Sequence, residues 1–347
     1  MSSAGKIVEV RPKYALPGGE IEVLAEGFQP DRDGSAACLL DANPCRITAL
    51  SSKRVIAVVP ASITEYNRAN IQLAASSGDT EVYSDAHEIH IAGRLADEMH
   101  IVANPAIDPS DDAIIVTRSG SRGQRLDNTI YRIETSGYVD ELPDPVLNPT
   151  GIAFDSDGEM YVTNRADGEV WVVGTGGNNS IHATGLGIAT GIAFDNDGVM
   201  YVGDRSGTIH RIKGFEIPRV FASLEPSVAA YHMAFGPDGK LYVSAPGLAS
   251  SDAIYAVDKK GDVTTFYRGL GRPQGLAFDT EGNLYVAACH RGRHGIVRIT
   301  PDASSVDHFV CGNNIVGLCF TRGGDMIVAT NETVYSLPVG IQGTILV

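Results

Sequence analysis

The stretch Thr150-Gly-Ile-Ala-Phe-Asp-Ser-Asp-Gly-Glu-Met-Tyr-Val-Thr163 returns almost unchanged as Thr190-Gly-Ile-Ala-Phe-Asp-Asn-Asp-Gly-Val-Met-Tyr-Val-Gly203. Its β-branched and aromatic residues favour two short strands, and the Asp-x-Asp-Gly between them favours a tight turn. Further copies begin at Tyr231, Gln274 and Val316, and a degenerate copy begins at Asn104. The copies follow one another at intervals of 40 to 46 residues, which is typical of one four-stranded blade of a β-propeller.

Six such units predict an all-β protein with a six-bladed propeller over residues 93–347. Third strands follow the repeats, for example Glu169–Val173, Thr208–Ile212 and Gly295–Ile299, and no helical periodicity is present. A propeller has to close its ring. We therefore expect the last blade to combine residues 90–98 with the inner strands over residues 325–338.

Residues 1–92 lack the repeat and form a second predicted domain. Short alternating runs such as Ile7–Pro12, Ile21–Phe28 and Arg54–Pro60 lie between Gly- and Pro-containing turns. This pattern predicts a small β-sandwich. With Pro12, Gly18, Gly19, Gly27, Phe28 and Pro60 at its signature positions, the segment resembles the immunoglobulin-like IPT/TIG fold.

The repeat P-x-G-I-A-F-D-x-x-G-x-x-Y-V, clearest at Pro149 and Pro273, resembles the NHL-repeat and regucalcin/gluconolactonase superfamily. The resemblance covers about residues 93–340. It implies a ligand site at one mouth of the central channel, where the inner strands start and the loops after the second strands lie. One propeller fold hosts many activities, so the resemblance indicates the fold more strongly than the function.

Composition excludes several functions. The chain has 27 Lys and Arg against 42 Asp and Glu, a net charge of −15, which argues against binding to nucleic acid or to anionic membranes. Neither an 18-residue apolar run nor an apolar signal region after Met1 is present, so we expect a cytoplasmic protein without a transmembrane helix. Cys38 and Cys45 lie close enough in sequence to form a disulfide, and free thiols are an equal alternative.

The resemblance also implies a divalent cation, calcium above all, held by Asn, Asp and Glu side chains at the mouth. Of the residues that start the inner strands, only Asn104 matches this set, and Glu98 is a candidate for the family's Glu. The Asp-x-Asp-Gly turns are too short for a twelve-residue calcium loop. We interpret them as hairpin turns capped by Asp.

Histidines supply the other candidates for chemistry. His232 takes the place that Gly holds in four other copies, and His290 and His294 lie in the polar segment over residues 288–295. Histidine serves acid–base catalysis near neutral pH or binds zinc. We predict catalytic roles for His232, His290, His294 and Asp204, and a calcium or zinc site drawn from Asn104, Asp204, His232 and His290. Core packing and a solvated loop are the alternatives, and Cys289 is a less favoured nucleophile.

Arginines recur after the second strands, in Thr117-Arg118, Asn164-Arg165 and Asp204-Arg205. Guanidinium groups suit an anionic substrate or a developing oxyanion. The alternative is a salt bridge between blades. The predicted substrate-binding residues are Arg118, Thr150, Asn164, Arg165, Thr190, Arg205, Tyr231, Gln274 and Arg291.

These features favour a lactonase-like hydrolase that acts on a cyclic ester or related small carbonyl compound, with histidine and metal assistance. A lyase that uses a channel histidine and a non-catalytic binding or scaffolding propeller are the alternatives. Convergence of His232, His290 and Asp204 in one pocket with perturbed pKa values would favour an enzyme. Separate, internally hydrogen-bonded positions would favour scaffolding. The N-terminal domain is expected to dock on the propeller, to extend a pocket wall, or to mediate a partner or oligomer contact.

Overall fold

The computed structural model describes residues 4–30, 36–77, 80–120, 126–143, 146–174, 176–249 and 251–344. These residues form 33 strands, turns and loops, and none of them lies in a helix. Accordingly, no helix among them could cross a membrane. The chain divides into two compact units. Unit 1 contains residues 1–94, 292–296 and 308–314, and unit 2 contains the remainder.

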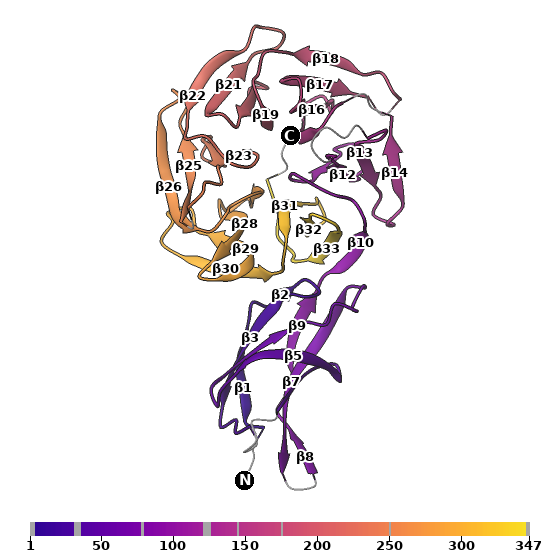
Figure 1. Ribbon diagram of the computed structural model, residues 1–347, viewed down its shortest axis with the longest axis vertical. Helices are drawn as coiled ribbons and strands as arrows, with labels where there is room; N and C mark the ends of the chain where they lie inside the picture. Colours follow the sequence, from indigo (N-terminus) through magenta and orange to yellow (C-terminus); the bar gives the residue numbers. More distant parts are fainter. Residues whose placement is uncertain are drawn as a thin grey trace. The chain divides into compact units, whose positions relative to one another are not determined.

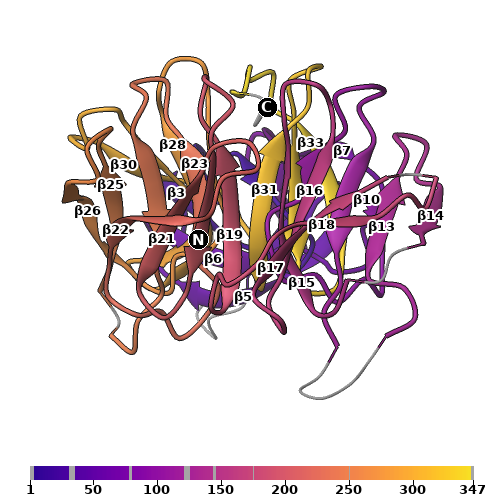
Figure 2. The same cartoon turned by 90° about the horizontal axis from the view of Figure 1, so that it is seen from above.

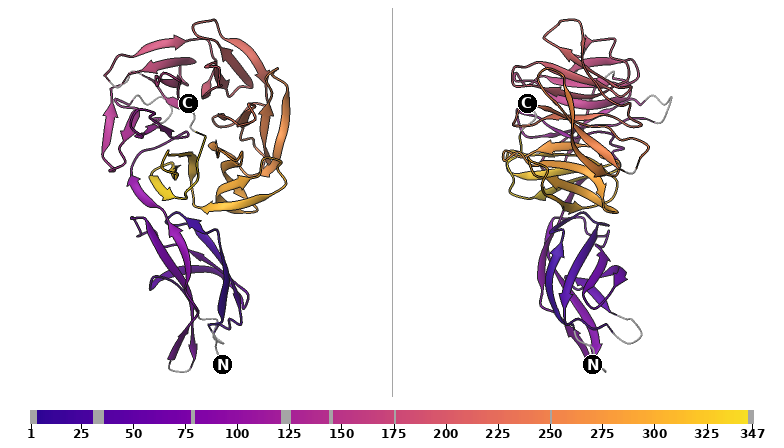
Figure 3. Two further views of the ribbon diagram at one scale, coloured as in Figure 1. Left: turned by 180° about the vertical axis from the view of Figure 1, so that it is seen from behind. Right: turned by 90° about the vertical axis from the view of Figure 1, so that its left-hand side faces the viewer.

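Unit 2 contains five separate four-stranded antiparallel sheets arranged around a ring (Figures 1 and 3). In four of them the strands follow chain order from the innermost to the outermost strand. These sheets are β11 (Ala106–Ile107), β12 (Ile114–Thr117), β13 (Ile130–Ile133) and β14 (Val139–Leu142); β15 (Pro149–Phe154), β16 (Met160–Asn164), β17 (Glu169–Val173) and β18 (Ser180–Ala183); β19 (Ala189–Phe194), β20 (Met200–Asp204), β21 (Thr208–Ile212) and β22 (Arg219–Ser223); and β23 (His232–Phe235), β24 (Leu241–Ser244), β25 (Asp252–Val257) and β26 (Val263–Leu270).

The fifth separate sheet joins distant parts of the chain. Its strands are β31 (Ile315–Phe320), β32 (Asp325–Thr330) and β33 (Val334–Pro338), and its outer strand is β10 (Gly93–Ala96). Backbone hydrogen bonds from Met99 to Glu332 and from Ile101 to Asn331 continue this contact. The predicted closure of the ring by both ends of the propeller sequence is confirmed.

Six separate blades were expected, and the structure differs at the remaining repeat. Its strands are β27 (Leu276–Phe278), β28 (Leu284–His290), β29 (Arg293–Ile299) and β30 (Val306–Cys311). They belong to a 13-stranded sheet because β30 also pairs with β2 (Tyr14–Ala15). A bare edge strand offers unpaired N–H and C=O groups, and β2 uses those of β30.

Residues 1–92 were expected to form a separate immunoglobulin-like sandwich, and no such separate sandwich is evident. Strand β2 lies in parallel between β9 and β30, so the N-terminal strands continue into the larger sheet. A core of buried side chains, including Ile21, Ile71 and Cys311, fills unit 1. Its strands are β1 (Lys6–Arg11), β3 (Glu20–Glu26), β4 (Ala37–Leu40), β5 (Asn43–Leu50), β6 (Arg54–Val58), β7 (Asn67–Ser77), β8 (Thr80–Tyr83) and β9 (His87–Ile91).

Two repeated interactions hold the propeller together. A Tyr of one second strand packs edge-on against a Phe of the next inner strand; the ring centroids lie 5.1 Å apart for Tyr161 and Phe194 and 5.2 Å apart for Tyr201 and Phe235. This geometry is the favoured one for aromatic pairs. The Asp-x-Asp-Gly turns are capped as predicted, since Asp155 Oδ1 accepts hydrogen bonds from the backbone N–H groups of Asp157 and Glu159. The strands run between two faces of the ring (Figure 2). We call the face with the Asp-x-Asp-Gly turns the turn face, and the opposite face, where the second strands end, the loop face.

Candidate functional site

The loop face is where the second strands end and the inner strands begin. Hydroxyl groups at these ends connect neighbouring blades. Thr117 Oγ1 donates to the carbonyl of Thr150 at 2.8 Å, and Thr163 Oγ1 donates to the carbonyl of Thr190 at 2.9 Å. Ser244 Oγ donates to the carbonyl of Gln274 at 2.6 Å. The same hydrogen bond thus recurs from blade to blade and fixes the starts of the inner strands.

Three of the predicted substrate-binding residues lie in this set of hydrogen bonds between blades. Thr150 and Thr190 are both buried. Thr190 Oγ1 donates to the carbonyl of Gly203 and accepts from the backbone N–H of Tyr231, whereas Thr150 Oγ1 is buried with no hydrogen-bond partner among the described residues. Gln274 contributes its backbone carbonyl and is half-buried. Thr150 and Thr190 therefore present no hydroxyl to solvent.

Asn104 lies between two other inner strands. Its Nδ2 donates to the carbonyl of Leu276 at 2.9 Å, and its Oδ1 accepts from the backbone N–H of Leu318 at 3.1 Å. A Cβ at Gly275 would overlap the Asn104 amide oxygen, so glycine is needed there for close approach. The predicted role of Asn104 as a metal ligand does not fit this geometry, because both ends of its amide join β27 to β31.

Asp204 shapes the loop after β20. Its Oδ1 accepts from the backbone N–H groups of Ile188 at 3.0 Å and Ser206 at 2.9 Å, and its Oδ2 accepts from the Ser206 hydroxyl. Its side chain is buried. Both oxygens are engaged within the protein, so the predicted base or metal ligand is here a loop-shaping carboxylate.

Asn164 shapes the loop after β16 in the same way, by bonding nearby backbone groups. Its Oδ1 accepts from the backbone N–H groups of Ala166 at 3.0 Å and Asp167 at 3.3 Å. Its Nδ2 donates to the Asp167 and Glu169 carboxylates. The predicted substrate contact through Asn164 is therefore replaced by contacts within the loop.

His232 and Tyr231 begin β23 and are enclosed. His232 is only 4% exposed, and burial lowers its pKa to about 4, so the ring is neutral at pH 7. The Tyr231 hydroxyl donates to the backbone carbonyl of Glu225 at 2.5 Å, and burial raises its pKa. Neither residue presents an exposed group for acid–base work.

The polar segment over residues 288–295 is a hairpin. Arg291 and Gly292 have φ values of 52° and 80° and form a two-residue turn between β28 and β29, the geometry that suits tightly paired strands. His290 is half-buried, and burial together with the charge of Arg291 lowers its pKa. His294 and Arg291 are exposed, and Cys289 is half-buried.

These candidates do not form a metal site. Within the described ranges, no three His, Cys, Asp or Glu side chains are grouped so that they could hold a metal ion. Of the four predicted ligands, Asn104 and Asp204 are used internally and His232 is buried. The described residues thus do not fit the calcium ion that the resemblance implied or the zinc ion that the histidines suggested.

The arginines after the second strands differ in their hydrogen-bond partners and in their burial. Arg118 Nη1 donates to the Tyr131 hydroxyl at 2.9 Å, within its own blade. Arg165 and Arg205, on adjacent blades, are both half-buried. Burial lowers the pKa of Arg165, and the nearby charge of Arg205 lowers it further. No ion pair of either guanidinium group occurs among the described residues, so the predicted alternative of salt bridges between blades finds no support there.

Arg205 bonds the backbone of two exposed apolar residues, Ile188 and Val228. Its backbone N–H donates to Ile188 and its Nη1 donates to the carbonyl of Val228 at 3.4 Å. The backbone N–H of Val228 in turn donates to Pro246, close in sequence to Leu248. Ile188, Val228 and Leu248 are 36%, 49% and 95% exposed. Sequence reasoning missed these three, although they lie in loops that differ between repeats, and we call them the apolar rim.

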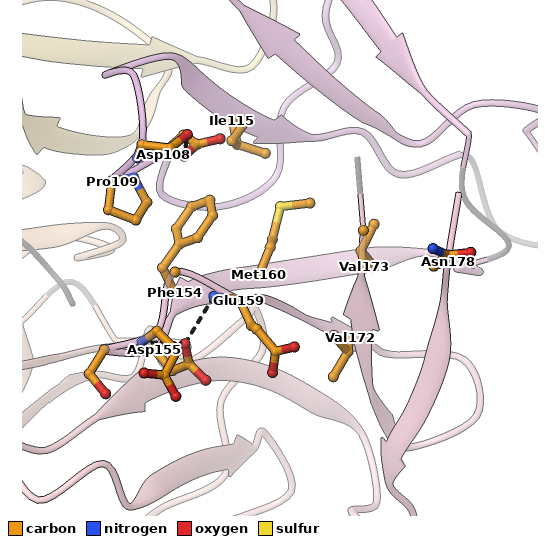
Figure 4. Close-up of a pocket in the computed structure, with 15 residues that line it drawn as sticks. Asp108, Pro109, Ile115, Phe154, Asp155, Glu159, Met160, Val172, Val173 and Asn178 are labelled. Atoms are coloured by element: carbon orange, nitrogen blue, oxygen red, sulfur yellow. Dashed lines mark hydrogen bonds between the residues drawn. The ribbon is translucent and has the colours of Figure 1, made fainter. Parts of the chain in front are cut away.

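Two clefts open on the turn face. The larger, of about 550 Å³, lies between the β11–β14 and β15–β18 blades, and Figure 4 shows its carboxylates and apolar side chains. Asp108, Asp155, Asp157 and Glu159 line it without a cationic side chain, but Asp155 is occupied in capping its own turn. The smaller, of about 400 Å³, contains Tyr201, Phe221 and Phe235 beside Arg211, Lys259 and Lys260. Neither cleft contains a predicted site residue.

Comparison with known proteins supports the fold. No family model and no curated protein matches the chain. A gluconolactonase structure from Xanthomonas campestris is 16% identical, with a TM-score of 0.61 over 88% of this chain and 97% of that one. Virginiamycin B lyase from Staphylococcus aureus is 16% identical, with a TM-score of 0.54 over 72% and 98%. An auxiliary nutrient binding protein from Bacteroides ovatus is 12% identical, with a TM-score of 0.55 over 97% and 99%.

At these identities the likeness concerns the fold alone. The chain has the β-propeller fold that gluconolactonases and virginiamycin B lyase share, with four-stranded blades. A specific substrate does not follow from it.

Proposed function

We propose that the protein binds, without chemical conversion, a small organic anion with an apolar body at the loop face. The observation that carries this proposal is the guanidinium pair of Arg165 and Arg205. Both groups are half-buried, they interact unfavourably with each other, and among the described residues no carboxylate neutralises them.

The like charges of Arg165 and Arg205 favour an anionic ligand. Two like charges that are partly removed from water raise the free energy of the unliganded protein. In a chain of net charge −15, acidic side chains are abundant, yet none forms an ion pair with either group in the part of the chain that the structure describes. A carboxylate or phosphate accepts paired hydrogen bonds from guanidinium groups. A ligand with such a group would relieve the repulsion.

The apolar rim supports the proposal that the bound anion carries an apolar body. Ile188 and Val228, whose carbonyls accept hydrogen bonds from Arg205, expose apolar surface, and so does Leu248, two residues beyond the Pro246 that accepts from Val228. Burying such surface contributes about 25 cal/mol per Å². An anion that also carries an aliphatic or aromatic body would gain from both the charges and the rim.

Binding is favoured over catalysis because two of the four predicted catalytic residues are enclosed or hydrogen-bonded within the protein. Asp204 accepts hydrogen bonds within its loop, and His232 is enclosed. The likeness to the auxiliary nutrient binding protein, which extends over 97% of this chain, agrees with a binding role.

The test is a titration of the full chain against a panel of aliphatic and aromatic carboxylates and phosphate monoesters. We expect at least one to bind, and Arg165→Ala and Arg205→Ala each to weaken it about ten-fold or more. Arg118→Ala is the matched control, because Arg118 holds the equivalent position but bonds Tyr131. Unchanged affinity in both Arg165→Ala and Arg205→Ala would overturn the proposal.

Hydrolysis of a lactone is the second candidate. His290 favours it, since this half-buried imidazole has a lowered pKa and would be neutral, and so able to accept a proton, at pH 7. The fold shared with gluconolactonases agrees with this role. A lactone panel assayed with and without chelator tests it. Activity that falls at least a hundred-fold in His290→Ala but not in His294→Ala would support hydrolysis. The same experiment with a macrocyclic lactone tests the lyase variant.

A further inference from the structure

Two cysteines of unit 1 face each other across a hairpin. Strands β4 and β5 are joined by a two-residue turn, with Asp41 and Ala42 at φ values of 45° and 69°. Cys38 lies directly opposite Cys45 in this antiparallel pair. Directly opposite residues lie on the same face of a sheet, with Cα atoms about 4.5–5.5 Å apart. That spacing falls within the roughly 4.4–6.8 Å that a disulfide spans.

Both thiols point into the core of unit 1 and contact each other. Cys38 is fully buried and Cys45 is 7% exposed. A hydrogen bond between the two thiols lowers the pKa of Cys45 and, together with burial, raises that of Cys38. In the closed hairpin, Cys45 is therefore the thiol that loses its proton more readily, and it is also the more exposed of the two.

The other cysteines lack this arrangement. Burial raises the pKa of Cys311 and of Cys319, as expected for inert thiols in apolar surroundings. Cys289 is half-buried and forms a β-bridge with Gly271. Of the five cysteines, all of which the structure describes, Cys38 and Cys45 alone are register partners.

A disulfide between Cys38 and Cys45 would lie where β5 changes from one neighbouring strand to another. At Cys45, β5 is paired with β4, and from Arg46 onward it is paired with β6, where Arg46 lies opposite Val58. A covalent link at this point would fix the hairpin where β5 changes partner.

We propose that Cys38 and Cys45 are a redox site, which a low-molecular-weight disulfide such as oxidised glutathione converts to an intramolecular disulfide. The Cys45 thiolate attacks one sulfur of oxidised glutathione, forming a mixed disulfide and releasing one glutathione thiolate. The Cys38 thiolate then attacks the Cys45 sulfur and releases the second glutathione. The protein loses two electrons and two protons, and oxidised glutathione becomes two reduced molecules. Because both thiols are buried, the reaction follows opening of the hairpin.

The experiment is oxidation of the full chain by oxidised glutathione, followed by intact mass and peptide mapping under non-reducing conditions. We expect the loss of two hydrogens without a retained glutathione, a single peptide link between Cys38 and Cys45, and a higher Tm than in the reduced protein. Cys38→Ser should instead retain one glutathione on Cys45. Cys289→Ser should behave as the wild type, which makes it the matched control.

Differential alkylation of the wild-type protein keeps the test independent of how the variants fold. In mild urea, where the hairpin opens, Cys38 and Cys45 should be protected together after oxidation and labelled together after reduction. Labelling of both thiols after oxidation, or a link to Cys311 instead, would overturn the proposal.

Discussion

The loops after β16 and β20 and the hairpin after β28 occupy the same place in the repeat but differ in how they use polar residues. In the two loops, Asn164 and Asp204 turn their side chains onto nearby backbone N–H groups, and the following arginines remain without a carboxylate partner among the described residues. After β28 the strands continue, and Arg291 and Gly292 make a tight turn. Polar density in a sequence therefore does not identify a site, and the charges without a carboxylate partner among the described residues are the stronger basis for a proposal.

The largest effect on the free energy of unfolding should come from His232, the enclosed histidine of the loop face. Burial lowers the pKa of His232 to about 4, while in the unfolded chain it is about 6.5. The unfolded state thus binds a proton that the folded state excludes, so stability falls as pH drops from 6.5 toward 4. We expect His232 to account for a loss of about 2–3 kcal/mol in the free energy of unfolding between pH 7 and pH 4.5.

Urea unfolding of the wild type and of His232→Gln at both pH values measures this effect. The variant retains the other histidines, so the difference between the two proteins isolates His232. Equal pH dependence in the two proteins would show that the ring is not enclosed.

Asp204→Ala should have the next largest effect. It leaves the part-buried backbone N–H groups of Ile188 and Ser206 without their carboxylate acceptor, which costs about 2 kcal/mol of unfolding free energy. The exposed Asp197 provides the control, because Asp197→Ala should change stability by less than about 0.5 kcal/mol. If Asp204 were instead a free site residue, the two variants would be equally stable in urea.

Asn164→Ala extends the comparison to the neighbouring loop. It removes the acceptor for Ala166 and Asp167 and should cost about 1 kcal/mol, since the lost group is uncharged. Chemical denaturation at pH 7 measures it. A loss as large as that of Asp204→Ala would mean that charge contributes nothing to loop shaping.

The smallest effect on stability is expected for the arginines. Arg205→Met removes a positive charge that acts unfavourably on Arg165, so stability should stay within about 0.5 kcal/mol of the wild type or rise. Thermal and urea unfolding at low salt provide the measurement. A loss above about 1 kcal/mol would reveal an ion pair at Arg205 and would weaken the case for an anionic ligand.

Much of the fold could be predicted from sequence, since the repeat that contains Tyr161 and Phe194 encodes both the strands and the contact between blades. The use of β10 in the last sheet also followed from ring closure. The pairing of β2 with β30 could not be predicted, because two residues at a sheet edge, Tyr14 and Ala15, leave no periodic signal.

The site was less predictable for a related reason. Asn104 and Asp204 have residue types suited to ligands, but Asn104 is bonded by two strands far away in sequence, and Asp204 bonds backbone and side-chain groups of its own blade. Leu276 and Leu318, which hold Asn104, offer only backbone atoms, and no side-chain pattern marks them. The arginines were predicted because they recur at one position, yet the difference between Arg118 and Arg165 required the structure.

The most direct test of the central claim is a comparison of one ligand in charged and uncharged form. For the best carboxylate from the panel, the affinities of the acid and of its primary amide would be measured with the wild type and with the Arg165→Ala/Arg205→Ala double variant. The account predicts that the wild type prefers the carboxylate by about ten-fold or more and that the preference disappears in the double variant. The same preference in both proteins would contradict it.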